Sequence, residues 1–321
     1  MAVYTEVTDL ELESFLADYG LGKLLAFKGI AEGVENSNFL LQTDAGLFIL
    51  TLYEKRVAAA DLPFFLALMK HLAARGLTCP QPVQTKSAKM LGTLAGRPAA
   101  IVTFLEGVSS RHPNVPQCAA LGTALAQLHR AGADFRGRRP NALSLAAWPQ
   151  LFALAAGRAE EVQAGLVSFL AAELAFLERS WPKDLACGTI HADLFPDNVL
   201  FLDDKVSGLI DFYFACTDFL AYDLAVCLNA WCFEPDFSFN VTKSMTLIES
   251  YQNVRKLAPK EIEALPVLAR GSALRFTLTR LVDWLNVPAG ALVRPKNPLE
   301  YVKRLRFHQR SKSLRDLGLK L

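Results

Sequence analysis

Residues 190–212 constrain the fold of this chain more than any other stretch, because they space polar side chains between apolar runs. The stretch reads IHADLFPDNVLFLDDKVSGLIDF. The apolar runs Val199–Leu202 and Val206–Ile210 flank a short acidic turn, a pattern that predicts a β-hairpin. The predicted hairpin gathers three polar side chains at one end of a two-stranded ribbon: Asp193, Asn198 and Asp211.

This group of side chains suits phosphoryl transfer, a reaction that needs positioning and charge neutralisation more than covalent help. A carboxylate takes the proton of the acceptor hydroxyl, and hard oxygen ligands hold Mg²⁺ on the phosphates of ATP. We therefore expect Asp193 to be the catalytic base and Asn198 and Asp211 to be the metal ligands, with His191 bracing the loop. The alternative is an acidic surface turn with a capping histidine. The apolar neighbours argue against it, because polar groups in such surroundings normally have partners or a function.

The motif H-A-D-L-F-P-D-N, followed by G-L-I-D-F, resembles the aminoglycoside-phosphotransferase-like branch of the protein-kinase fold. Along the whole chain the resemblance narrows to the homoserine kinase family. It implies an α+β, bilobal, protein-kinase-like fold. Residues 1–105 would form a small antiparallel-sheet lobe that binds the nucleotide, and residues 106–321 a larger, mostly helical lobe for catalysis and substrate binding. In the enzymes it resembles, an aspartate at the position of Asp223 anchors the catalytic segment.

The same resemblance implies the reaction and its cofactors. ATP and Mg²⁺ would bind in the cleft between the lobes, and the phosphoryl group would pass to the side-chain hydroxyl of L-homoserine. The product would be O-phospho-L-homoserine, a step of threonine biosynthesis. Rival acceptors within the same fold are choline, methylthioribose and an aminoglycoside.

A glycine-bearing loop ahead of the predicted strand Phe39–Gln42 is the candidate phosphate-covering loop. As a bare pattern it also fits an ordinary hairpin. The sequence G-V-E-N-S-N-F resembles the opening of the homoserine kinase family, and the segment Thr103–Gly107 corresponds to the link between the lobes. The resemblance thus implies a set of nucleotide-binding residues: Gly33, Glu35, Asn36, Ser37, Asn38, Thr103 and Leu105.

One position departs from the wider kinase pattern. Protein kinases carry a phosphate-binding lysine on the strand that here corresponds to Leu47–Tyr53, and Thr51 stands at that position. Lys28, Lys55 and Arg56 are alternative cations, and the sequence does not choose among them. The missing lysine motivates a rival hypothesis, a nucleotide-binding protein without catalytic activity. The presence of all three catalytic side chains argues against that rival.

Homoserine is a zwitterion, so its site needs a guanidinium for the carboxylate and a carboxylate or carbonyl for the ammonium. Arg275 or Arg280 is expected to fill the first role, and Trp231 to line the acceptor pocket. Three residues are alternatives for the ammonium: Glu32, Glu35 and Asp218. The helices expected near the end of the chain carry a mixed to basic set of charges. These charges favour an acceptor that bears an anion over a polycation.

Composition excludes several classes of protein. Of the 321 residues, 52% are hydrophobic and 21% charged, which indicates a globular chain. The net charge of +2 creates no large field to attract nucleic acid or an anionic membrane. With no leader-like start and no charge-free apolar run long enough to span a bilayer, we expect a soluble cytoplasmic protein. The six cysteines, in apolar contexts, are expected to be reduced core residues.

Overall fold

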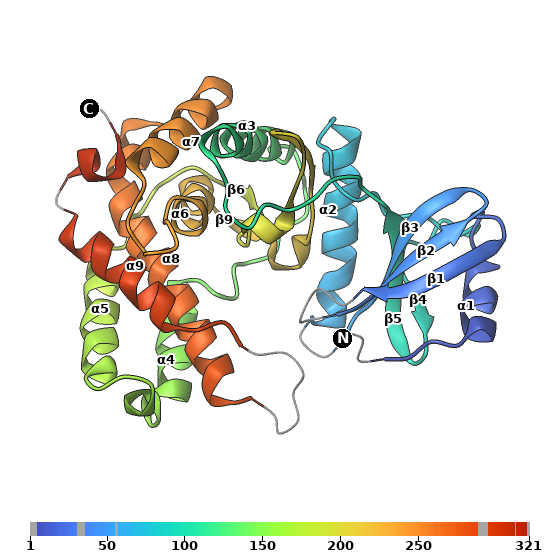
Figure 1. Cartoon of the computed structure of the whole chain (residues 1–321), viewed down its shortest axis with the longest axis horizontal. Helices are drawn as coiled ribbons and strands as arrows, with labels where there is room; N and C mark the ends of the chain where they lie inside the picture. Colours follow the sequence, from blue (N-terminus) through green and yellow to red (C-terminus); the bar gives the residue numbers. More distant parts are fainter. Residues whose placement is uncertain (1–4, 31–35, 55–56, 288–294, 312, 320–321) are drawn as a thin grey trace.

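The computed structural model describes residues 5–30, 36–54, 57–287, 295–311 and 313–319. An antiparallel sheet lies at one end of the molecule and helices make up the other end, with helix α2 between them (Figure 1). The predicted α+β architecture, a small antiparallel sheet followed by a mostly helical part, is confirmed. Within the described residues, no helix has the length and apolarity needed to cross a membrane.

The sheet has five strands in the spatial order β1-β2-β3-β5-β4, and each neighbouring pair is antiparallel. In chain order the strands are β1 (Leu24–Ile30), β2 (Ser37–Thr43), β3 (Gly46–Leu52), β4 (Gly92–Leu94) and β5 (Arg97–Thr103).

The two faces of this sheet pack against different cores. Helix α1 (Asp9–Leu16) begins at an N-cap threonine, as predicted, and covers the face that carries Phe39 and Leu50. Helix α2 (Leu62–Ala74) covers the opposite face. Its buried side chains belong to the same core as the helical part of the molecule, so α2 ties the sheet to the helices.

Helix α6 is buried along nearly its whole length and lies at the centre of the helical part (Figure 1). The longest of the described helices is α8. The seven helices described in this part are α3 (Val115–Ala131), α4 (Trp148–Ala156), α5 (Leu166–Ser180), α6 (Leu220–Trp231), α7 (Val241–Val254), α8 (Pro259–Leu285) and α9 (Leu299–Arg310).

Two small strand pairs complete the helical part. The predicted hairpin is present as β7 (Val199–Leu202) and β8 (Lys205–Leu209). Strand β6 (Cys187–Ile190) pairs with β9 (Cys216–Phe219) in antiparallel fashion. Cys187 is exposed, contrary to the expectation of a core residue, whereas the other five cysteines are buried.

The segment after β5 is fastened to the β7–β8 hairpin. Val108 and Phe201 exchange two backbone hydrogen bonds of 2.9 and 3.0 Å. Gly107 has φ +135°, and a Cβ there would lie 2.2 Å from the Ser207 hydroxyl oxygen. A side chain is excluded on both grounds, so the glycine allows the link between sheet and helices to lie directly on the hairpin.

Candidate active site

The end of the β7–β8 hairpin brings Asn198 and Asp211 together. Val199 pairs with Leu209, and the Ile210 N–H donates to the Asn198 carbonyl at 3.0 Å. Asp211 follows directly, with its backbone in the left-handed region at φ 63°. Because the register is fixed by the hairpin, the two side chains of the predicted metal pair emerge at the same end of the ribbon.

Asp193 lies beside Asn198. The Asn198 side-chain amide donates to the Asp193 carbonyl at 2.8 Å, and its nitrogen lies 3.5 Å from an Asp193 carboxylate oxygen. This leaves the amide oxygen of Asn198 as the atom available to a metal ion. The Asp193 side chain is 19% exposed, so its carboxylate remains open to a solute.

His191 braces the loop from inside, as the sequence indicated. Its Nε2 lies 2.9 Å from the Ile210 carbonyl, and the Asp193 N–H donates to its Nδ1 at 3.3 Å. Because a carbonyl only accepts, the hydrogen of the ring is on Nε2. Burial lowers the pKa of His191, which favours the same neutral form. The ring therefore joins the Asp193 loop to the residue that precedes Asp211.

Asp223 on α6 anchors the start of this loop. One of its oxygens accepts from the His191 N–H at 2.7 Å, and the other accepts from the Ala192 N–H at 2.8 Å. His129 adds a third contact at 3.2 Å. Burial alone would raise the pKa of Asp223, but the hydrogen bond and charge of His129 and the hydrogen bond from His191 hold it below its usual value. Asp223 is fully buried, and its hydrogen bond from the Ala192 N–H holds Ala192 at φ 63°.

Two cations and a second carboxylate surround Asp193. Burial raises the pKa of Asp193, while the charges of Arg275 and Lys296 lower it and that of Asp197 raises it further. The net direction is upward, toward a more basic carboxylate.

Arg275, predicted to bind the substrate carboxylate, lies behind the loop of residues 191–198, which carries Asp193 and is called the catalytic loop below. It is 3% exposed, its guanidinium donates to the Ala192 carbonyl, and one nitrogen lies 3.9 Å from an Asp193 oxygen. The guanidinium also stacks 4.1 Å from the centre of the Phe276 ring. Arg275 is thus already engaged with the protein and adjoins the catalytic carboxylate.

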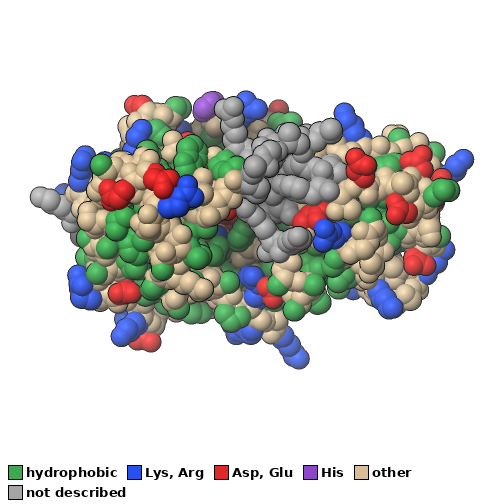
Figure 2. Space-filling model, turned by 90° about the horizontal axis from the view of Figure 1, so that it is seen from below, with side chains coloured by type: hydrophobic (Ala, Val, Ile, Leu, Met, Phe, Trp, Pro, Cys, Tyr) green, Lys and Arg blue, Asp and Glu red, His purple; other side chains and the backbone are tan. Residues whose placement is uncertain are grey.

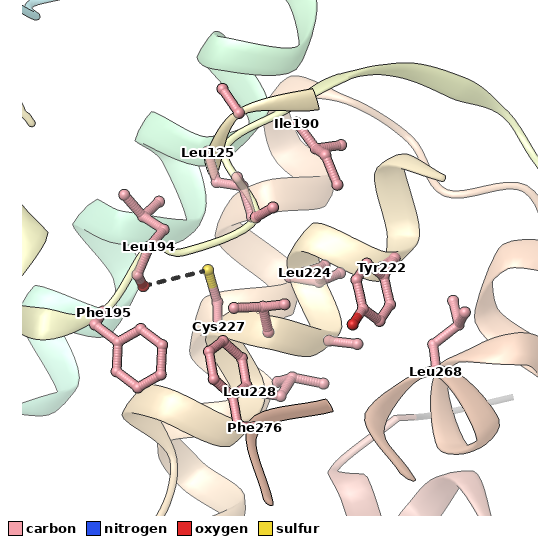
Figure 3. Packing of buried hydrophobic residues seen from close by; sticks show 14 of the residues in the cluster. Leu125, Ile190, Leu194, Phe195, Tyr222, Leu224, Cys227, Leu228, Leu268 and Phe276 are labelled. Carbon is pink, nitrogen blue, oxygen red and sulfur yellow. Dashed lines mark hydrogen bonds between the residues drawn. The ribbon is translucent and has the colours of Figure 1, made fainter. Parts of the chain in front are cut away.

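The structure places the other two predicted substrate residues away from an open surface. Arg280 binds Glu300 at 2.8 Å across α8 and α9. Trp231 is 1% exposed and donates to the Leu194 carbonyl at 2.8 Å, so it supports the catalytic loop from within. Figure 3 shows Leu194 and Phe195 in the same core, facing Cys227 and Phe276.

The predicted nucleotide-binding residues that the structure describes lie at two places in the sheet. At the start of β2, Ser37 donates to Glu54 at 2.9 Å and Asn36 accepts from the Glu54 N–H at 3.3 Å. Asn38 accepts from Thr51, which stands at the position of the kinase lysine, at 2.8 Å. The Ser37 hydroxyl and the amide oxygens of Asn36 and Asn38 are thus engaged within the sheet. Five further candidates lie outside the described residues: Glu32, Gly33, Glu35, Lys55 and Arg56.

Thr103 and Leu105 lie where the sheet joins the helical part. The Thr103 hydroxyl accepts from the Gln81 N–H at 2.9 Å. Leu105 packs on β8, where a Cβ on Gly208 would lie 2.6 Å from the leucine side chain.

Tyr213 is a site residue that the sequence reasoning missed. Its hydroxyl lies 3.1 Å from that of Tyr53, and its ring packs edge-on against Phe65 of α2, with centroids 5.8 Å apart. It follows Asp211 by two residues and so ties the segment that carries this predicted metal ligand to the sheet. The only signal in the sequence was the aromatic run after Asp211, which also fits plain core packing.

Comparison with known proteins agrees with this fold. Residues 26–257 match the model of the phosphotransferase enzyme family, so the chain is a phosphotransferase of protein-kinase-like fold. Among solved structures it resembles an amicoumacin kinase (TM-score 0.69, 13% identity, 94% of this chain and 92% of that chain). It also resembles a choline kinase from Cryptosporidium parvum (TM-score 0.67, 16% identity, 94% of each chain).

Closer relatives narrow the family. The chain is 67% identical over 319 residues to a homoserine kinase of Afipia carboxidovorans, covering 99% of this chain and 98% of the relative. It is 66% identical over 319 residues to a homoserine kinase of Xanthobacter autotrophicus, with 99% of both chains covered. The chain belongs to the homoserine kinase family.

Proposed function

We propose that this chain transfers the γ-phosphoryl group of ATP to the side-chain hydroxyl of L-homoserine, giving O-phospho-L-homoserine and ADP in threonine biosynthesis. The observation that carries the proposal is the 67% identity, over almost the full length, to a relative of that name. The arrangement of Asp193, Asn198 and Asp211 supplies a chemical basis for it.

Asp193 acts as the base of this reaction. Its carboxylate orients the acceptor hydroxyl and accepts its proton as the hydroxyl oxygen bonds to the γ-phosphorus. The bond from that phosphorus to the β–γ bridging oxygen breaks, and ADP leaves with the electron pair. The upward pKa shift of Asp193, caused mainly by burial, increases the basicity of the carboxylate.

Asn198 and Asp211 would hold Mg²⁺ through an amide oxygen and a carboxylate. These hard oxygen donors suit that ion, which neutralises phosphate charge when bound. In the described part of the chain, no group of three or more His, Cys, Asp or Glu side chains is placed to hold a metal. This fits Mg²⁺ better than a metal with an all-protein site, because Mg²⁺ usually shares one or two protein ligands with substrate phosphates.

ATP would bind between the sheet and the helical part, with the lobe boundary near residues 105 and 106. Backbone groups at Asn36, Ser37 and Asn38 would face the phosphates, together with the predicted Gly33 and Glu35. Thr103 and Leu105 would border the adenine. Leu105 supports this placement because it lies on the hairpin whose end carries the metal ligands.

A screen of ADP release across small hydroxyl compounds tests the proposal. The purified chain is offered Mg-ATP with L-homoserine, choline, methylthioribose or an aminoglycoside. Turnover should be highest with L-homoserine. A clear preference for another acceptor would move the chain to a different substrate, and nucleotide binding without turnover of any acceptor would show a catalytically silent protein.

A further inference from the structure

Asp197 and Lys296 form an ion pair that the reaction described so far does not use. The Lys296 ammonium nitrogen lies 3.3 Å from an Asp197 carboxylate oxygen. Their side chains are 60% and 61% exposed, so both charges are open to a solute. Asp197 lies in the loop between the catalytic base and the metal-ligand asparagine, whereas Lys296 directly precedes α9.

The pair adjoins the catalytic carboxylate. Two tight backbone hydrogen bonds, Phe195 N–H to Asp193 carbonyl at 2.8 Å and Asn198 N–H to Phe195 carbonyl at 2.9 Å, fold the loop so that Asp197 stays close to Asp193. Lys296 lies 5.2 Å from the centre of the Phe195 ring. The electrostatic influence of both charges on Asp193 agrees with this proximity.

The two arginines expected at the substrate carboxylate are engaged with other groups of the protein. Arg275 is buried against Ala192, and Arg280 is bound to Glu300. Of the described cations beside Asp193, Lys296 is the exposed one, and its ion-pair partner Asp197 is exposed as well. An amino-acid head group carries a carboxylate and an ammonium close together. Each of these charges is opposite in sign to one charge of the Asp197–Lys296 pair.

We propose that Asp197 and Lys296 bind the zwitterionic head of the acceptor, with Asp197 accepting from its ammonium and Lys296 donating to its carboxylate. This rests on the proposed function and assigns specificity for an amino acid to this pair. An exposed ion pair contributes little to stability, so exchanging it for contacts with substrate costs little. The hydroxyl at the far end of the acceptor then faces Asp193.

The test compares L-homoserine with two acceptors that each lack one charge. 3-Amino-1-propanol has no carboxylate, and 4-hydroxybutanoate has no ammonium. Lys296→Gln should lower kcat/KM for L-homoserine by about 10- to 100-fold, the range of a charge-assisted hydrogen bond, and lower that for 3-amino-1-propanol far less, because only the shared influence of Lys296 on Asp193 is lost there. Asp197→Asn should lower kcat/KM for L-homoserine by a similar factor and lower that for 4-hydroxybutanoate far less, because only the shared influence of Asp197 on Asp193 is lost there. Where a truncated acceptor turns over too slowly, its inhibition constant against L-homoserine gives the same comparison.

Arg158→Gln is the matched control, because Arg158 forms an exposed ion pair of 3.0 Å with Glu161, in a different part of the chain from Asp197 and Lys296. This variant should leave kcat/KM unchanged for every acceptor. Thermal melting checks that each variant is folded. Equal losses on all acceptors, or an unchanged value for L-homoserine, would overturn the assignment of the pair. If the unaltered chain fails to phosphorylate L-homoserine but turns over another acceptor, the proposed function itself is wrong.

Discussion

Replacing Asp223 by alanine tests whether this buried carboxylate holds the catalytic loop in place. The substitution removes the acceptor of two backbone hydrogen bonds, from His191 and Ala192, and of the contact to His129. His191 is fully buried and Ala192 is 2% exposed, so neither N–H group is open to bulk water. Each buried donor left unpaired costs about 1–3 kcal/mol, so the two backbone groups together predict a loss of about 2–6 kcal/mol in the free energy of unfolding.

Urea denaturation followed by circular dichroism measures this loss, and a steady-state assay measures the effect on kcat. Asp223→Asn is the comparison variant, because it keeps one acceptor oxygen while turning an NH₂ group toward another donor. It should be destabilised less than the alanine variant. Both variants should lose kcat, because the segment that they release carries Asp193. An alanine variant that unfolds within 1 kcal/mol of the unaltered chain and keeps its kcat would refute the anchoring role.

Two further predictions concern the metal and the pH dependence of stability. Asp211→Ala should weaken binding of Mg-ATP, measured by titration calorimetry, and have little effect on nucleotide offered without Mg²⁺; equal loss in both conditions would contradict a metal-ligand role. Burial, with the charges of Arg270 and Arg304, lowers the pKa of His308 to about 3, so the unfolded chain takes up this proton at a higher pH than the folded one. Stability should therefore fall as pH drops below 6.5, the ordinary pKa of histidine, by about 2 kcal/mol at pH 5. His308→Gln should flatten that dependence in urea titrations at pH 6.5 and at pH 5.

Local sequence was enough to predict the grouping of Asp193, Asn198 and Asp211. The three residues lie on one short hairpin and its flanking loop, and the alternation of apolar residues fixes the register. The role of Asp223 came instead from the family resemblance, and the structure supplies its physical basis in two backbone hydrogen bonds.

Contacts between distant segments were beyond this reasoning. Arg275 meets Ala192 across 83 positions of sequence, and only the packing of α8 behind the catalytic loop brings them together. Trp231 is of a residue type that often lines pockets, yet the close packing of α6 directs its indole N–H to the Leu194 carbonyl. Ser37 is likewise engaged by Glu54, which follows the end of the neighbouring strand β3 by two residues. In each case the residue type indicated polar recognition, and the tertiary neighbours decided the partner.

The transfer rate of an Asp193→Asn variant tests the role of the catalytic base most directly. Asparagine keeps the size of the side chain and removes its basicity, so a single-turnover assay with saturating Mg-ATP and L-homoserine should show a loss of about 10²–10⁴ in rate. Calorimetry should show Mg-ATP affinity largely intact, because Asp193 is not one of the proposed metal ligands. A variant that transfers the phosphoryl group at the rate of the unaltered chain would contradict the assignment of Asp193 as the base.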